Sequence, residues 1–308
     1  MKEQNYLVLY IDILGYQQML MDKDISNGTI VNALKEMERY TYGSGELSFE
    51  EKVKIYMFSD NIAVCVKATS KETRTTGLFL LSLMAARLQM FCAIEYGIFI
   101  RGSIVQGKLY AESRILFGDA IVKAVEMEKE AKFPRIIIES KLFADAIDGY
   151  KAICKDIFFP VHDDVTYKNL FLLLKRLINI NNSEKVEKTG ANHWCELVSQ
   201  DTDEQYYIDF LNQLFFWYGD NRCNAIDVAK YINRYAVVLY IRLRKFINND
   251  VILPKYVWCV EKLMQFIPKL IDEIQFGKNA MEEFMNAEFL LTTWSHEGIA
   301  KIIEQHPD

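Results

Sequence analysis

The chain has 308 residues, of which 51% are hydrophobic and 25% are charged, and its formal net charge at pH 7 is −6. This composition predicts a globular protein of one large domain, or of one domain with an extension, that buries a sizeable core. The acidic balance provides no general attraction for duplex nucleic acid. We therefore expect any phosphate-bearing ligand to be held by a local site or by a metal ion.

The six cysteines are widely spaced, form no C-x-x-C pair and mostly lie in apolar runs, which predicts free thiols in a reducing compartment. We expect a cytoplasmic protein without a signal peptide, because Lys2 and Glu3 lead directly into a strand-like run. The longest apolar stretch, residues 76–97, contains Arg87 and Gln89 and is short for a bilayer span. It predicts a buried helix and no direct membrane contact.

The spacing of apolar residues predicts the elements of the first half of the chain. In order, these are a strand at 6–16, a helix at 16–40, two strands joined by the turn Ser59-Asp60-Asn61, a helix at 73–94, a strand at 97–110, a helix at 117–131, a strand at 133–140 and a helix at 140–147. This order indicates an α+β layer, a mainly antiparallel sheet with helices on one face.

The composition changes in the second half. Residues 179–194 are polar and indicate a linker or loop, residues 195–211 carry a strand and a turn, and residues 224–305 have helical spacing. We therefore divide the chain into a domain at 1–178 and a mostly helical C-terminal extension at 179–308. The aromatic and aliphatic residues of the extension are interpreted as core or dimer contacts rather than as a ligand site.

Two carboxylates carry the chemistry that the sequence suggests. Asp12 lies at the end of an apolar strand, and Asp60 lies in the turn of the hairpin. Either one alone is explained by structure, Asp12 as a helix cap and Asp60 as a turn former. Together, two strand-end carboxylates in a small sheet can converge on one or two Mg²⁺ or Mn²⁺ ions, which recruit substrate phosphates. The chemistry indicated is phosphoryl transfer.

Five segments, taken in order, resemble the catalytic domains of class III nucleotidyl cyclases. They are "YIDILGY", "FSDNIAV", "IRGSIVQGKLY", "ILFGDAIVKAVEMEKEA" and "FPRIII", within about residues 5 to 150. The resemblance implies a ferredoxin-like catalytic domain in which Asp12, the Ile13 carbonyl and Asp60 hold two Mg²⁺ or Mn²⁺ ions. It also implies that the 3′-hydroxyl of a nucleoside triphosphate attacks its own α-phosphate and expels pyrophosphate.

The chain departs from the purine cyclases of that family at four positions. Tyr56 and Ile115 stand where those enzymes carry the residues that read the purine. Val122 and Glu126 stand where the family has the Asn and Arg that stabilise the transition state. These departures speak against a conventional adenylate or guanylate cyclase.

The pattern is more similar to the bacterial antiphage pyrimidine cyclases of the Pycsar type, and "DTDEQYYIDFL" and "LPKYVW" extend that similarity to about residue 260. The resemblance implies a homodimer that converts CTP or UTP to cCMP or cUMP, a messenger read by a separate effector. It assigns Tyr56, Phe58 and Ile115 to substrate binding and Arg101 to the phosphates as a catalytic residue. No nucleic-acid partner is expected.

Alternative interpretations remain, both for single residues and for the whole chain. Tyr56 alone reads as a half-buried strand tyrosine, and Arg101 alone as an ion-pair partner of Glu95 or Glu112. The alternatives for the whole chain are a purine-specific class III cyclase and a catalytically inactive regulator with the same fold that binds nucleotide. Retention of Asp12 and Asp60 favours an enzyme, whereas Val122 and Glu126 favour the inactive regulator.

Overall fold

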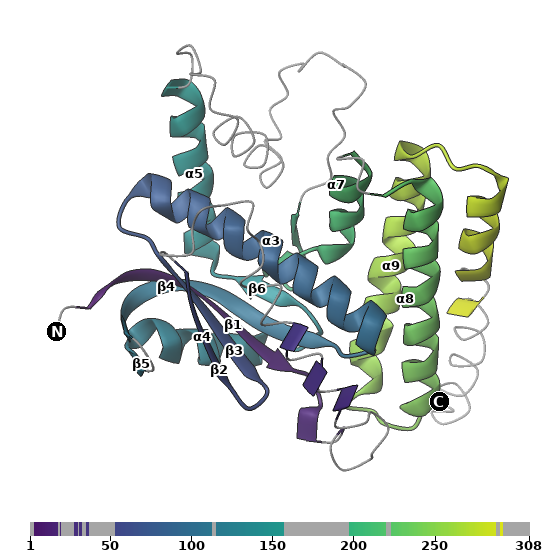
Figure 1. Cartoon of the computed structure of the whole chain (residues 1–308), viewed down its shortest axis with the longest axis horizontal. Helices are drawn as coiled ribbons and strands as arrows, with labels where there is room; N and C mark the ends of the chain where they lie inside the picture. Colours follow the sequence, from purple (N-terminus) through teal and green to yellow (C-terminus); the bar gives the residue numbers. More distant parts are fainter. Residues whose placement is uncertain are drawn as a thin grey trace, which may run out of the picture.

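The fold is that of a computed structural model, shown in Figure 1. It describes residues 3–17, 19, 28–29, 31–32, 35–36, 53–112, 115–156, 197–219, 223–287 and 290–291. Most of the helix predicted at 16–40, the linker predicted at 179–194 and the domain boundary predicted at 178 lie outside these residues. The boundary therefore stays a prediction.

A mixed sheet forms the centre of the molecule. Its strands are β1 (Gln4–Ile13), β2 (Val53–Phe58), β3 (Asn61–Lys67), β4 (Ile100–Glu112), β5 (Ile115–Phe117), β6 (Ile136–Ile138), β7 (Val198–Gln200) and β8 (Tyr206–Ile208). The order across the sheet is β2-β3-β1-β4-β6-β8-β7, with β5 paired to β4. All pairs are antiparallel except β4 with β6. The first four strands have the ferredoxin-like order, and the predicted α+β class is confirmed.

Helices cover both faces of the sheet, whereas the sequence analysis expected them on one. Helix α3 (Lys71–Tyr96) lies on one face and α4 (Asp119–Glu130) lies on the other (Figure 1). Alternate residues of β1 divide between the two sides, with Leu7, Leu9 and Ile11 in the larger core and the tyrosines and valine between them in the core under α4. A strand buried on both faces reads as a continuous apolar run, as residues 6–11 do.

Helix α3 is the long apolar helix predicted from residues 73–94. Ser70 begins it with a capping box, and Gly97 ends it with a left-handed φ of 62°. Among the described residues it is the one helix long and apolar enough to cross a bilayer, but most of it is buried within the protein. Its apolar surface is thus used to cover the sheet, as predicted.

The C-terminal segment is largely helical, as predicted, and the region at 195–211 predicted to carry a strand and a turn supplies two short strands. Its helices are η1 (Phe210–Asn212), α7 (Gln213–Gly219), α8 (Ala225–Lys245) and α9 (Leu253–Glu273), and α5 (Ser140–Asp156) precedes them. Strands β7 and β8 join the sheet beside β6. Figure 1 shows α8 and α9 side by side at one end of α3. Among the described cysteines, Cys65, Cys92, Cys223 and Cys259 are free thiols.

A buried ion cluster fastens α9 to the sheet. The Arg135 side chain is fully buried and forms ion pairs with Asp201 and Asp203. Asp201 also accepts hydrogen bonds from Trp258 Nε1 and Lys262 Nζ on α9, both at 2.8 Å. Because each charge in the cluster is paired, its burial is tolerated. The cluster therefore sets the position of α9 relative to β6 and, through β6, relative to β4.

Candidate active site

The two predicted carboxylates lie at strand ends, on the face of the sheet that α4 covers. The strand register places Phe58 opposite Asn61, Asn61 opposite Asp12, and Asp12 opposite Arg101. These four residues therefore form one row across β2, β3, β1 and β4. Their side chains share a face because cross-strand partners point the same way.

The β2–β3 turn holds Asp60 beside the end of β1. Ser59 adopts a φ of 59°, which lets the turn reverse in two residues. The Ile13 amide donates to the Asp60 carbonyl at 3.3 Å, and Asn61 Nδ2 donates to Asp60 Oδ1 at 3.1 Å. Asn61 Oδ1 in turn accepts from the Tyr10 hydroxyl at 2.6 Å. Asp12, Ile13 and Asp60, the three predicted metal ligands, are thus brought together.

Arg101 lies at the centre of the same group. Its Nε is 3.3 Å from Asp12 Oδ2 and also forms an ion pair with Glu128 of α4. The partners considered in the sequence analysis are engaged elsewhere, since Glu95 pairs with Arg234 and Glu112 accepts from Tyr110. The close approach of β1 and β4 at Gly102, where a Cβ would lie 2.2 Å from the Tyr10 carbonyl oxygen, helps to bring Arg101 to Asp12.

Ionising Asp12 and Glu128 costs free energy, because both carboxyl groups are partly buried. Burial raises the pKa of Asp12, the Arg101 guanidinium opposes that shift, and the nearby Asp60 raises the pKa further. Burial also raises the pKa of Glu128, again opposed by Arg101 and reinforced by Asp12. Lys255 also lowers the pKa of Asp12, so three acidic side chains lie near two cations and the site keeps an excess of negative charge.

The donor set suits a hard divalent cation. Asp12 and Asp60 repel each other, and a cation between them removes that repulsion. The Asp12 side chain is 19% exposed, so its oxygens are accessible from solvent. Within the described part of the chain, no group of three or more His, Cys, Asp or Glu side chains is placed to hold a metal ion. A metal here would therefore depend on the two aspartates, backbone oxygens and substrate phosphates.

Tyr56 lies one row further along the sheet. It is opposite Ala63, which is opposite Tyr10, so the tyrosine belongs to the core under α4. It is 9% exposed, more buried than the sequence analysis assumed. Its hydroxyl has no hydrogen-bond partner among the described residues, and burial raises its pKa to about 12. A buried hydroxyl without a partner is unusual and invites a functional explanation.

The other two predicted substrate contacts are exposed. Phe58 is 45% exposed and lies 6.4 Å from the Tyr10 ring, and Ile115 on β5 is 57% exposed. Phe117 of β5 and Val122 of α4 are likewise exposed apolar residues. Phe58 lies in the row of Asp12 and Arg101, whereas Ile115 and Phe117 pair with the far end of β4, so apolar side chains are exposed near both ends of this strand.

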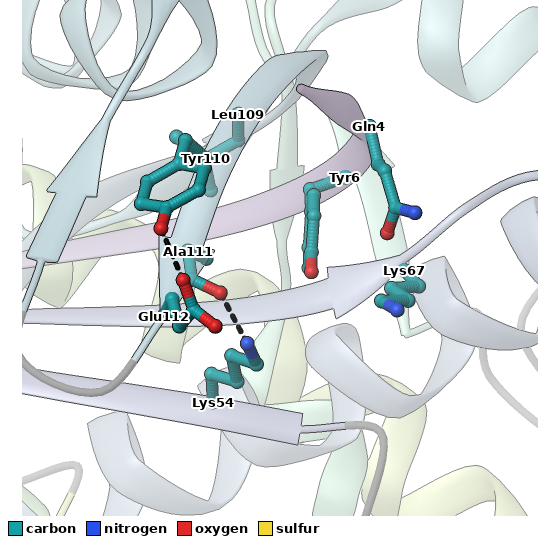
Figure 2. A pocket seen from close by; sticks show the side chains of 8 residues that line it. All are labelled: Gln4, Tyr6, Lys54, Lys67, Leu109, Tyr110, Ala111 and Glu112. Atoms are coloured by element: carbon teal, nitrogen blue, oxygen red, sulfur yellow. Dashed lines mark hydrogen bonds between the residues drawn. The ribbon is translucent and has the colours of Figure 1, made fainter. Parts of the chain in front are cut away.

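A pocket of about 330 Å³ opens at the far end of the same face. Figure 2 shows Lys54 and Glu112 on one side of it and Gln4, Tyr6 and Lys67 on the other. Lys54 donates to the Ala111 carbonyl, and Tyr110 donates to Glu112. From Tyr6 to Asp12 the strand advances roughly 20 Å. The pocket is therefore separate from the carboxylate site of the same chain.

Two charged residues of the site, Glu128 and Lys255, were not predicted from the sequence. Glu128 follows Ala120 and Ala124 at intervals of four residues, and these three are the buried positions of α4. That spacing places them on one stripe of a helix and was the available signal. Lys255, from the first turn of α9, is close enough for the charges of Asp12, Glu128 and Arg101 to act on it. No local pattern indicates that α9 reaches β1.

No family model matches the sequence, and no curated protein matches it. Among solved structures the chain is similar to the adenylyl cyclase CyaB from P. aeruginosa, at 15% identity and a TM-score of 0.37 over 48% of this chain and 82% of that one. It is similar to the guanylyl cyclase Cya2, at 14% identity and a TM-score of 0.33 over 47% of this chain and 79% of that one. It is also similar to an adenylate/guanylate cyclase/hydrolase from Silicibacter pomeroyi, at 16% identity and a TM-score of 0.35 over 54% and 88%. Likenesses of this size carry no argument about activity.

Proposed function

We propose that the protein is a metal-dependent nucleotidyl cyclase whose reaction centre is the Asp12–Asp60 pair. The observation that carries this proposal is the position of Asp12 and Asp60 at adjoining strand ends of a ferredoxin-like sheet, where the Ile13 amide bonds the Asp60 backbone carbonyl and the Arg101 guanidinium lies beside Asp12. A surplus of carboxylates at such an edge is the setting in which Mg²⁺ or Mn²⁺ and a triphosphate are held.

The residues divide the chemistry between them. Asp12, Asp60 and the Ile13 carbonyl would hold two Mg²⁺ or Mn²⁺ ions, which supply charge neutralisation at the α-phosphate and lower the pKa of the 3′-hydroxyl. The 3′-oxygen forms a bond to the α-phosphorus as the bond from that phosphorus to the β-phosphate oxygen breaks. The hydroxyl proton leaves to solvent, and pyrophosphate departs. Arg101 offers its remaining N–H groups to the charge that develops on the phosphates.

The proposed substrates are CTP and UTP. A tyrosine in place of a purine-reading residue shortens a base pocket and offers a ring face and a hydroxyl. The exposed Phe58 and Ile115 support this assignment. The cyclic pyrimidine product would act as a cytoplasmic messenger in antiphage defence and would be read by a separate effector.

A homodimer belongs to the proposal. The exposed apolar residues Phe58, Ile115, Phe117 and Val122 give a second copy a surface to cover. In such a dimer the aspartates of one chain would face the Ile115 side of its partner. This arrangement would bring Ile115, which pairs with Glu112 at the far end of β4, to the Asp12 row of the other chain.

A second candidate is an inactive regulator that binds nucleotide without turning it over. The observation that favours it is α4 itself, where Val122 is apolar and 57% exposed and carries no group able to stabilise a transition state. A purine-specific cyclase is the third candidate.

The experiment that separates these candidates is incubation with each of the four nucleoside triphosphates in turn, with Mn²⁺ or Mg²⁺. Products are identified by mass and by their 3′,5′ linkage. Formation of cCMP or cUMP supports the proposal, and formation of cAMP or cGMP supports the purine enzyme. Binding of a triphosphate without any product supports the regulator.

A further inference from the structure

We propose that Lys255 of α9 binds the β- and γ-phosphates of the nucleotide, so that the C-terminal helices supply the triphosphate-tail subsite. This inference rests on the proposed function, because it names the residue that receives the leaving group of that reaction. The geometry behind it is independent of base choice and of the residues on α4.

A small cavity lies immediately beyond the end of β1. Its lining is largely apolar, from Leu14, Met19, Phe246, Ile252 and Tyr256, and three cations also line it, Arg242, Lys245 and Lys255. Its volume is about 110 Å³, which gives room for a few water molecules or a phosphate group but not for a nucleoside. The cavity begins two residues after Asp12, beyond the end of β1 that lies away from Tyr56.

Of the three cations that line this cavity in the described part of the chain, Lys255 is the one left available. Arg242 Nη2 donates to the Gly97 carbonyl at 2.8 Å, and Lys245 Nζ lies 5.0 Å from the centre of the Phe246 ring. Lys255 makes no hydrogen bond or ion pair to another described residue. An ammonium group in partial burial without a partner carries a desolvation cost that an anionic ligand offsets.

The electrostatics of Lys255 agree with this role. Burial, and after it the Arg101 guanidinium, lower the pKa of Lys255, while Asp12 and Glu128 oppose the shift. The Lys255 side chain is therefore close enough to Asp12 and Glu128 to feel their charge, and it also lines the cavity. Lys255 also occupies the first turn of α9, at the positive end of the helix dipole, although its own backbone N–H and that of Leu253 are already bonded to the Ile252 and Asn249 carbonyls.

The leaving group requires such a subsite. When the bond between the α-phosphorus and the bridging oxygen breaks, the electron pair stays with pyrophosphate, whose negative charge rises. An ammonium group at that end stabilises the departing pyrophosphate more than it stabilises the intact triphosphate. The buried Arg135–Asp201–Trp258 contacts hold α9 in place, so the position of Lys255 is fixed before substrate binds.

The test uses the full-length protein and nucleotides that cannot cyclise. Dissociation constants of 3′-deoxy-CTP and 3′-deoxy-CMP are measured by calorimetry with Mn²⁺ present, and the adenine and guanine analogues are measured alongside. Lys255→Met is expected to weaken triphosphate binding about ten- to a hundredfold while monophosphate binding is unchanged. Lys255→Arg keeps the charge and is expected to retain most of the affinity. Lys230→Met, at an exposed position of α8, removes the same charge and is expected to change nothing.

Three outcomes overturn the inference. Unchanged triphosphate affinity in Lys255→Met refutes the subsite while leaving the proposed function intact. An equal loss of triphosphate and monophosphate affinity, with Lys255→Arg equally impaired, shows that the residue supports the fold. A wild-type protein that binds no nucleotide refutes the proposed function itself and this inference with it.

Discussion

Replacing Tyr56 by phenylalanine separates a structural tyrosine from one that reads the base. The Tyr56 ring packs in the core under α4, and its hydroxyl has no partner among the described residues. Tyr56→Phe keeps the ring and removes only this oxygen. In contrast, Tyr56→Ala would empty the ring's space and cost about 3 kcal/mol or more of stability, which would obscure any effect on specificity.

The expected magnitudes follow from the environment of the hydroxyl. An unsatisfied buried polar group costs about 1–3 kcal/mol, so its removal should leave the free energy of unfolding unchanged or raise it by about 1 kcal/mol. If the hydroxyl bonds a pyrimidine, its loss costs about 0.5–1.5 kcal/mol of discrimination, or roughly two- to tenfold in the ratio of kcat/KM for CTP or UTP over ATP. The variant should therefore be at least as stable as the wild type and less selective.

The assay pairs urea unfolding with kcat/KM for the four nucleoside triphosphates in the wild type and Tyr56→Phe. An unchanged kcat/KM ratio would assign Tyr56 to the core alone and remove it from the base pocket. A clear loss of stability would mean that the hydroxyl has a partner after all. Either result refutes the reasoning given for this residue.

Four further outcomes are expected. Asp12→Asn and Asp60→Asn should each lower the cyclisation rate by about a thousandfold or more, because each removes a metal ligand and its charge, with the thermal unfolding midpoint as the control. Glu128→Gln should break the ion pair with Arg101 and reduce kcat. It also removes a buried carboxylate whose pKa is raised in the folded state, so the free energy of unfolding should fall less as pH rises. Because Arg101 lies beside Asp12 of its own chain, heterodimers of Asp60→Ala and Arg101→Ala protomers should recover no activity, and recovery would place Arg101 in the partner's site. The hydrogen bond from Arg135 lowers the pKa of Asp203 below its usual 3.8, so stability is lost as pH falls through and below that value, and Asp203→Asn should flatten this acid limb in urea unfolding.

The proximity of Asp12 and Asp60 could be predicted from the sequence. Each follows an apolar strand, and the alternation of the β2–β3 hairpin leaves only one register that buries Ala63 and Cys65. The α+β class followed from the order of the elements. These features are local or depend on pairs of neighbouring strands, which periodicity describes well.

Features that depend on packing between distant segments could not be predicted from the sequence. The placement of α4 on the opposite face depends on how its stripe of Ala120, Ala124 and Glu128 meets the sheet. The position of Lys255 depends on the buried cluster of Arg135 with Asp201 and Trp258, residues far apart in sequence. The burial of Tyr56 likewise depends on α4, since a strand pattern alone does not say what covers the strand.

The central claim is that the Asp12–Asp60 pair cyclises a nucleoside triphosphate, and the stoichiometry of its products tests this most directly. Wild-type protein and Asp60→Asn are each incubated with CTP or UTP and Mn²⁺, and pyrophosphate and 3′,5′-cyclic nucleotide are quantified in the same samples. The account predicts equal amounts of the two products from the wild type and neither from Asp60→Asn. Pyrophosphate without cyclic nucleotide, or the same yield from both proteins, would contradict it.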